Sequence, residues 1–286
     1  MTPLPHALAA SGALLQRRQV LAALASLPMA AGAAAVAHDA DAALHAAVDG
    51  PQRSAANRAR DAARHPYETL AFFGLRPDWQ VVEIAPGGGW YTEILAAYLN
   101  PKGRLYAAHE PADGSPGQQR ARAAFRAKLA ADPATYRRVV LGTLPVAGFT
   151  DIHPPGGADA VLTFRNIHNW IADGHFDETL RAFHAVLKPG GVLGVEEHRA
   201  APGTSLARVI ESGYVPQDLV VERARAAGFV LAGASEINAN PRDSHDHAQG
   251  VWALPPTLRG GAVDREKYLA IGESDRMTLK FVKAGG

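Results

Sequence analysis

Residues 81–99 constrain the fold more than any other part of the chain. A short β-branched run, Val81–Ile84, predicts a buried strand, and Gly87–Gly89 then predict a turn. The apolar residues that follow recur at helical spacing: Ile94, Leu95, Tyr98 and Leu99. Strand, glycine turn and helix together bring bare backbone and a helix N-terminus up to a ligand.

Glu83 lies at the carboxyl end of that strand, where its carboxylate could accept hydrogen bonds from ligand donors. The alternative is a tight turn that only connects a strand to a helix. A single glycine triplet does not separate these two interpretations, so the rest of the chain has to decide.

Strand-like and helix-like segments alternate along the remaining sequence. Helices are expected near 118–131, 176–187 and 215–227; strands are expected near 104–108, 138–141, 157–163, 192–196, 229–235 and 277–282. This alternation predicts an α/β fold with a doubly wound, mostly parallel sheet.

Composition sets limits on size and chemistry. The chain has 286 residues, 47% of them hydrophobic and 20% charged, which suits one α/β domain with a full core. It contains no cysteine, so disulfides, a cysteine nucleophile and thiolate metal sites are excluded.

The first 37 residues are typical of an export signal. Arg17 and Arg18 form a twin-arginine start, an alanine- and leucine-rich run follows, and Ala35–Ala37 supplies a small-x-small cleavage site. We therefore expect a periplasmic protein without a membrane span once the signal is removed; a cytoplasmic protein with an alanine-rich leader is the alternative. Without these two arginines, 27 of the 29 basic residues remain against 28 acidic ones. A near-neutral body does not attract polyanions, so a nucleic-acid partner is not expected.

The sequence divides into three regions, of which the export signal is the first. Residues 38–78 are predicted to form an N-terminal helical extension, with surface helices at 39–65. Residues 79–286 form the main domain, which carries a polar, proline-containing insertion at 236–274.

Polar side chains follow several predicted strands. His109 and Glu110 end the second strand, 20 and 21 positions after Gly89, where an acidic residue of a dinucleotide-type fold holds ribose hydroxyls. Glu110 is the chemically better candidate, but counting does not show which of the two points inward. The loop Phe164–Trp170 follows the fourth strand, and His198 follows the fifth.

These segments resemble the motif series of class I S-adenosylmethionine-dependent methyltransferases. The motif residues are Val81–Thr92, Asp159 before the fourth strand and Leu187–Gly191 before the fifth. More narrowly, Glu83–Glu93 together with Ile271–Phe281 is similar to a group of exported bacterial predicted methyltransferases.

The resemblance implies a seven-stranded Rossmann-like sheet with its last strand antiparallel, and S-adenosylmethionine as cofactor. Gly87, Gly89 and Glu83 would contact the methionine part, and His109 or Glu110 the ribose. Ala85 replaces the family's first glycine, and Thr143 stands near the position of an acidic residue beside the adenine. Asn166 completes the expected cofactor contacts.

Methyl transfer needs an in-line approach of nucleophile to sulfonium, and a base if the nucleophile arrives protonated. His168 and His198 are the candidate bases, because imidazoles titrate near neutrality. Candidate substrate contacts are Tyr91, Asn169, Trp170, and, from an insertion that could form a lid, Asn240 and His245. His245–His247 has a spacing that metal sites share with solvated loops, so no metal is predicted.

The sequence thus predicts methyl transfer from S-adenosylmethionine to a small molecule or an exposed protein group. The alternative is an exported ligand-binding or accessory protein that keeps the fold without transfer. A nicotinamide oxidoreductase is disfavoured, because Thr92 takes the place of the third glycine of a Gly-x-Gly-x-x-Gly pattern. Neither the substrate nor the oligomeric state can be read from these residues.

Overall fold

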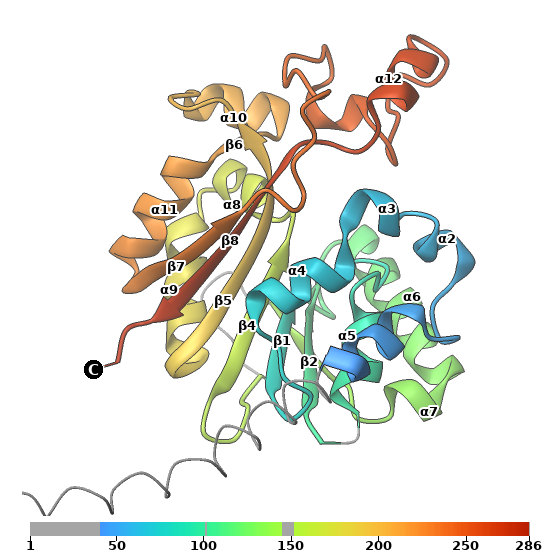
Figure 1. Ribbon diagram of the computed structural model, residues 1–286, viewed down its shortest axis with the longest axis vertical. Helices are drawn as coiled ribbons and strands as arrows, with labels where there is room; N and C mark the ends of the chain where they lie inside the picture. The colour runs from blue at the N-terminus through green and yellow to red at the C-terminus, as the bar shows by residue number, and fades with distance from the viewer. Residues whose placement is uncertain (1–40, 101, 145–151, 286) are drawn as a thin grey trace, which may run out of the picture. The chain divides into compact units, whose positions relative to one another are not determined.

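The computed structural model describes residues 41–100, 102–144 and 152–285, which form an α/β domain around one twisted sheet (Figure 1). The predicted export signal lies outside the described residues. Within the described ranges, no helix combines the length and apolar character needed to cross a membrane.

The sheet follows the order β3-β2-β1-β4-β5-β8-β7, and all neighbours are parallel except those of β8, which runs antiparallel to β5 and β7. Its strands are β1 (Gln80–Ile84), β2 (Arg104–His109), β3 (Val140–Thr143), β4 (Ala158–Phe164), β5 (Leu187–Ala200), β7 (Phe229–Ser235) and β8 (Arg276–Lys283). The predicted doubly wound sheet with an antiparallel last strand is confirmed. A two-residue eighth strand, β6 (Val215–Pro216), pairs with the end of β5.

Helices cover both faces of this sheet. A helix at residues 41–49 precedes α2 (Ala55–Arg58), α3 (Asp61–Arg64), α4 (Pro66–Phe73), α5 (Thr92–Leu99), α6 (Pro116–Ala131), α7 (Pro133–Tyr136), α8 (Ile167–Ala172), α9 (Phe176–Val186), α10 (Leu206–Ser212), α11 (Gln217–Ala226) and α12 (Arg265–Ile271). A short 3-10 helix, η1 (Gly250–Ala253), lies in the insertion.

Two hydrophobic cores follow from the period-two alternation of the strands. Val82 and Ile84 of β1 join one core with α8, α9 and α11, whereas Val81 joins the other with α4 and α5. Figure 1 shows α9 and α11 on one side of the sheet and α4 on the other. Because parallel strands end at one edge, the carboxyl ends of β1, β4 and β5 meet there (Figure 1).

The predicted bounds differ from the structure at two strands. β3 begins two residues later than expected and continues to Thr143, since it pairs with β2 as far as His109. β5 is much longer than the predicted 192–196: its antiparallel pairing with β8 continues to His198 and its pairing with β6 to Ala200. Tertiary pairing, which leaves no local signal, extends both strands.

The expectation of surface helices at 39–65 is wrong for part of that segment. Arg53 and Arg64 are each only 2% exposed, and their guanidinium groups lie 4.9 and 4.8 Å from the Trp90 ring centroid. Arg53 also pairs with Asp61. This part of the extension is packed against the glycine turn.

Candidate functional site

A cavity of about 430 Å³ lies at the carboxyl ends of β1, β4 and β5. This volume falls within the range of roughly 300–1,000 Å³ typical of small-molecule sites. Its lining comes from six separate parts of the chain: α2–α3, the end of β1 with the turn after it, the end of β4 with the loop after it, His198 of β5, the segment 251–257 of the insertion, and Glu273–Ser274 before β8. An open α/β sheet binds ligands at this edge.

The glycine turn forms one wall of the cavity. Gly87 and Gly88 line it, and a Cβ added at either position would meet no atom within 4 Å. The carbonyl of Gly87 accepts a hydrogen bond from Nε2 of His109 at 3.2 Å, which attaches the turn to the end of β2. Bare backbone therefore faces the cavity, as a close-lying ligand chain requires.

Ala85 begins this turn in the left-handed conformation, with φ of 45°. Its N–H still donates to the carbonyl of Ala108 at 2.8 Å. A side chain in this region of backbone space is sterically strained, which explains why the resembled family has glycine here. Ala85 therefore reproduces the glycine turn at an energetic cost.

Glu83 lies on the floor of the cavity at the end of β1. Its carboxyl accepts a 2.6 Å hydrogen bond from Oγ1 of Thr92, at the start of α5. Burial raises the pKa of Glu83 to about 7, against a smaller opposing effect of the Thr92 hydrogen bond. A cationic ligand group would favour the ionised form, so Glu83 is suited to bind an ammonium.

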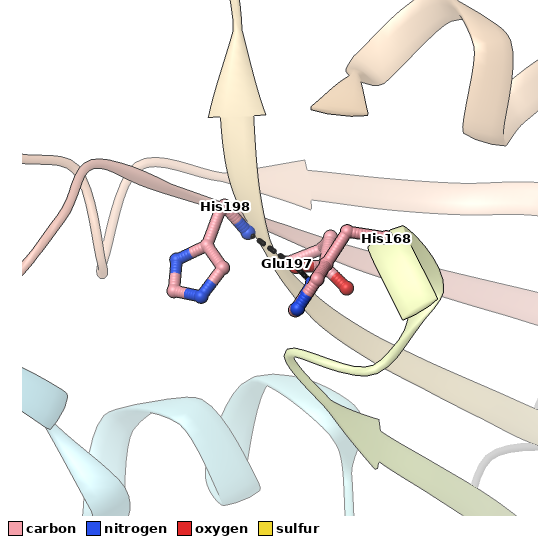
Figure 2. A group of neighbouring side chains, drawn as sticks. All are labelled: His168, Glu197 and His198. Carbon is pink, nitrogen blue, oxygen red and sulfur yellow. Dashed lines mark hydrogen bonds and ion pairs between the residues drawn. The ribbon is translucent and has the colours of Figure 1, made fainter. Parts of the chain in front are cut away.

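His168 lines the cavity and forms a hydrogen-bonded pair with Glu197, which lies behind the lining (Figure 2). Nδ1 of His168 lies 3.0 Å from Oε1 of Glu197, and a carboxylate can only accept, so Nδ1 carries the proton. The backbone N–H groups of Ile167 and His198 also donate to Glu197, at 2.5 and 2.9 Å. Glu197 thus fixes the imidazole, and Nε2 of His168 is the ring nitrogen left to accept a proton.

His198 lies beside His168, with ring centroids 5.3 Å apart (Figure 2). Its Nδ1 is 2.6 Å from Oγ of Ser274. Burial and the nearby His168 and Arg165 lower the pKa of His198 well below its usual value. His198 is consequently a neutral, weakly basic group, whereas His168 has a carboxylate partner that can stabilise its protonated form.

The ligand atoms of His168, Glu197 and His198 lie within 4.8 Å of one another, a spacing that could hold a metal ion. One observation weighs against that use. The Glu197 oxygens already accept three N–H groups. A histidine–carboxylate pair explains the same geometry.

Glu273 joins the N-terminal extension to the turn before β8. It accepts from Arg60 at 2.7 Å and from Arg64 at 3.1 Å. Burial disfavours its charge, but Arg64, Arg276 and Arg60 outweigh burial and lower the pKa of Glu273. Arg276 in turn pairs with Glu196 at 2.8 Å, and Glu196 accepts from the Tyr91 hydroxyl at 3.0 Å.

Seven of the residues predicted from the sequence line this cavity: Glu83, Ala85, Gly87, Tyr91, Asn166, His168 and His198. They come from three strand ends, as expected for an α/β sheet. The Asn166 amide bonds the carbonyl of Ile84 and the hydroxyl of Thr163, so it also ties β4 to β1.

The other predicted cofactor residues are absent from the described cavity lining: Gly89, His109, Glu110 and Thr143. Gly89 would bring a Cβ against Phe125 and Lys128, so it is needed for packing of α6. Nδ1 of His109 accepts from the N–H of Glu110, and the Glu110 carboxylate accepts from Gln118 at 2.8 Å. Their contacts to a cofactor remain a prediction.

The predicted substrate residues Asn169, Trp170, Asn240 and His245 also lie away from the described lining. Trp170 is in the hydrophobic core against Phe183, and Asn169 is exposed on α8. Asn240 bonds the carbonyls of Ile271 and Glu273, and His245 pairs with Asp275 at 3.2 Å. A different part of the insertion, including Trp252 and Pro255–Thr257, forms the cavity wall.

Sequence reasoning missed several residues of the site: Asn57, Arg60, Arg64, Trp90, Arg165, Glu197, Glu273 and Ser274. Glu197 could have been found, because it directly precedes a candidate base at a strand end. The Arg60–Arg64 spacing on an alanine-rich helix carries no such signal, since solvated helices show it as often.

Comparison with solved structures places the domain in a known fold. No protein-family model matches the chain, and no curated protein matches its sequence. A SAM dependent methyltransferase from Aquifex aeolicus aligns over 85% of this chain and 98% of its own, with 14% identity and a TM-score of 0.53. The [4+2]-cyclase SpnF aligns over 83% and 86%, with 20% identity and a TM-score of 0.55.

The glycopeptide N-methyltransferase MtfA, solved with the S-adenosylmethionine analogue sinefungin, aligns over 78% of this chain and 87% of its own. Its identity is 15% and its TM-score 0.50. At these identities the likeness concerns the fold, and the cyclase shows that one fold hosts different reactions. The chain therefore has the Rossmann-like fold of S-adenosylmethionine-dependent methyltransferases.

Proposed function

We propose that the protein transfers a methyl group from S-adenosylmethionine to a hydroxyl of a small molecule. The observation that carries this proposal is the His168–Glu197 pair, which shares one cavity with the exposed backbone of Gly87 and Gly88. The segment 251–257 favours a small molecule over an exposed protein group, because residues of this segment form part of the cavity wall.

The residues present fit the methionine part of the cofactor. Gly87 and Gly88 offer backbone without side chains, and Glu83 offers a buried carboxyl for the ammonium. When bound, S-adenosylmethionine supplies a methyl group on a positively charged sulfur, which departs as a neutral thioether.

His168 would act on the acceptor. A hydroxyl is a weak nucleophile while protonated, so Nε2 of His168 takes its proton as the oxygen–methyl bond forms. Glu197 stabilises the resulting imidazolium and prevents rotation of the ring. Tyr91 is unsuited to this role, because burial and the Glu196 carboxylate raise its pKa well above the usual value.

Titration calorimetry of residues 38–286 with S-adenosylmethionine tests the cofactor assignment directly. We expect saturable binding that Gly87→Val abolishes, since a β-branched side chain is strained at a φ of 57° and would occupy the space that the ligand needs. Gly174→Val is the matched control: it has φ of 78° and open space around it, but lies away from the cavity. Absence of heat at millimolar cofactor would contradict the proposal.

A second candidate is a ligand-binding or accessory protein without transfer activity. It is favoured by the loop that directly follows β2: the Glu110 carboxylate is bonded to Gln118, and no acidic residue of this loop is among the described cavity residues. Native mass spectrometry of the purified protein separates the two candidates. A retained ligand other than S-adenosylmethionine or its demethylated product would favour the second.

We further propose that the protein is exported to the periplasm through its twin-arginine leader. Arg17→Lys/Arg18→Lys should retain the precursor in the cytoplasm, as measured by cell fractionation and by precursor size. Unchanged processing of this variant would contradict export by the twin-arginine route.

A further inference from the structure

We propose that the acceptor substrate carries a carboxylate and that Arg165 binds this carboxylate inside the cavity. The inference rests on the proposed function, because it concerns the acceptor that His168 would deprotonate. It starts from a charge balance that leaves one arginine of the cavity without a carboxylate.

Arg165 directly follows β4 and lines the cavity. Its Nε is buried without a partner, and no hydrogen bond or ion pair among the described residues involves its guanidinium. The side chain as a whole is half-buried. A buried polar nitrogen usually has a hydrogen-bond partner, since leaving it unpaired is costly. A guanidinium held at the edge of a cavity in this state is therefore suited to an anionic ligand.

The backbone at Arg165 supports the same conclusion. Its φ is 62°, a left-handed conformation that is strained for a residue with a side chain. The N–H of Arg165 nevertheless donates to the carbonyl of Glu196 at 2.7 Å, so β5 holds this conformation in place. This strained residue therefore lies where the chain leaves β4 and begins to line the cavity.

Each of the neighbouring arginines already contacts a carboxylate. Glu273 accepts from Arg60 and Arg64, and Glu196 accepts from Arg276. Glu83 has a pKa of about 7 and is not fully ionised at neutral pH. The surplus is therefore positive. Burial and the nearby Arg64 lower the pKa of Arg165 to about 10, against the opposing effect of Glu196 and Glu273.

Two features indicate the kind of acceptor. A planar carboxylate matches the two parallel N–H groups of a guanidinium. The rings of Trp90, Tyr91, Phe164 and Trp252 also line the cavity, which favours a flat, aromatic body between the carboxylate and the hydroxyl. Hydroxybenzoates are the simplest molecules that combine these three features.

The test measures binding of 2-, 3- and 4-hydroxybenzoate and of the matching hydroxybenzamides, which are neutral and of the same shape. Titrations are done with and without saturating S-adenosylmethionine. We expect at least one hydroxybenzoate to bind roughly 10- to 100-fold more tightly than its amide, as a charged hydrogen-bonded pair of about 1.5–3 kcal/mol implies. Equal binding of acid and amide, or no binding of any acid, would overturn the proposal.

Variants of Arg165 separate this role from others. Arg165→Met should remove the preference for the acid, Arg165→Lys should keep part of it, and Arg76→Met, an exposed arginine paired with Asp78, should leave it unchanged. Without ligand, Arg165→Met should melt no lower than the parent protein, because it removes an uncompensated charge; a structural arginine would lower the melting temperature.

Cofactor affinity distinguishes the remaining cases. If Arg165→Met weakens S-adenosylmethionine binding and leaves the hydroxybenzoates unaffected, the arginine serves the cofactor carboxylate and the inference is wrong. If the parent protein binds a hydroxybenzoate through Arg165 but not the cofactor, the anion site stands and the proposed methyl transfer fails.

Discussion

Nδ1 of His168 lies 3.0 Å from Oε1 of Glu197, which itself is held by the backbone N–H groups of Ile167 and His198. The two side chains come from α8 and β5, 29 residues apart in the chain. This contact gives His168, but not the neighbouring His198, a fixed orientation and a carboxylate partner, so His168 is the expected base.

His168→Ala should lower methyl transfer about 10²- to 10⁴-fold, the usual contribution of a positioned base. Glu197→Gln should also lower it, because an amide cannot stabilise the imidazolium. Neither change should alter the dissociation constant of S-adenosylmethionine more than about twofold, since neither residue belongs to the glycine turn. Release of S-adenosylhomocysteine with the best hydroxybenzoate measures the rate.

Asn169→Ala is the control for this pair, because Asn169 is exposed on the same helix. Full activity of His168→Ala together with inactivity of His198→Ala would assign the base to the other histidine.

Glu83→Gln should change how stability depends on pH. The pKa of Glu83 is raised from 4.5 to about 7, so the folded protein holds this proton more tightly than the unfolded chain. Stability from Glu83 is therefore full below pH 4.5 and is lost as pH rises through 7. Between these limits the parent protein should lose on the order of 3 kcal/mol relative to Glu83→Gln.

Urea denaturation at pH 5 and pH 8 measures this difference. The exposed Glu178, changed to Gln, serves as control and should give parallel curves. A parent protein that gains stability over Glu83→Gln as pH rises would show the opposite linkage and refute the buried, proton-retaining carboxyl.

Glu273→Gln should destabilise the fold by about 3–5 kcal/mol, because it leaves the buried Arg64 without its carboxylate. The matched control is Glu236→Gln. Glu236 also pairs with an arginine, Arg199, but its side chain is 69% exposed, so the change should cost less than about 1 kcal/mol. Equal unfolding midpoints of Glu273→Gln and Glu236→Gln in urea would mean that the contacts of Glu273 with Arg60 and Arg64 do not stabilise the fold.

Ala85→Gly should stabilise the protein by up to about 1 kcal/mol. Glycine relieves the left-handed strain at φ of 45°, and the gain exceeds the added entropy of the unfolded chain. Ala97→Gly, in the middle of α5, is the same chemical change at a helical position and should instead cost about 1 kcal/mol. Thermal unfolding of both variants decides; a lower melting temperature for Ala85→Gly would contradict strain at this position.

The sequence by itself determined the architecture. Period-two and helical spacing are local properties, so Val81–Ile84, the glycine triplet and the later alternation were sufficient for a doubly wound, mostly parallel sheet. The antiparallel last strand was expected only from the resemblance to class I S-adenosylmethionine-dependent methyltransferases. Position at a strand end was likewise sufficient to bring Glu83, Asn166, His168 and His198 to one cavity, because parallel strands end at one edge.

Only the tertiary structure decided the partners of these residues. Trp170 and His168 stand two positions apart on one short helix, yet one packs into the core and the other lines the cavity. Arg60 and Arg64 meet Glu273 more than 200 residues later, and this contact leaves Arg165 as the arginine without a carboxylate among the described cavity residues. Hydrophobic periodicity predicts which face of a helix or strand a residue occupies. Ion pairs and unpaired charges depend instead on distant segments that pack together, and no local pattern encodes them.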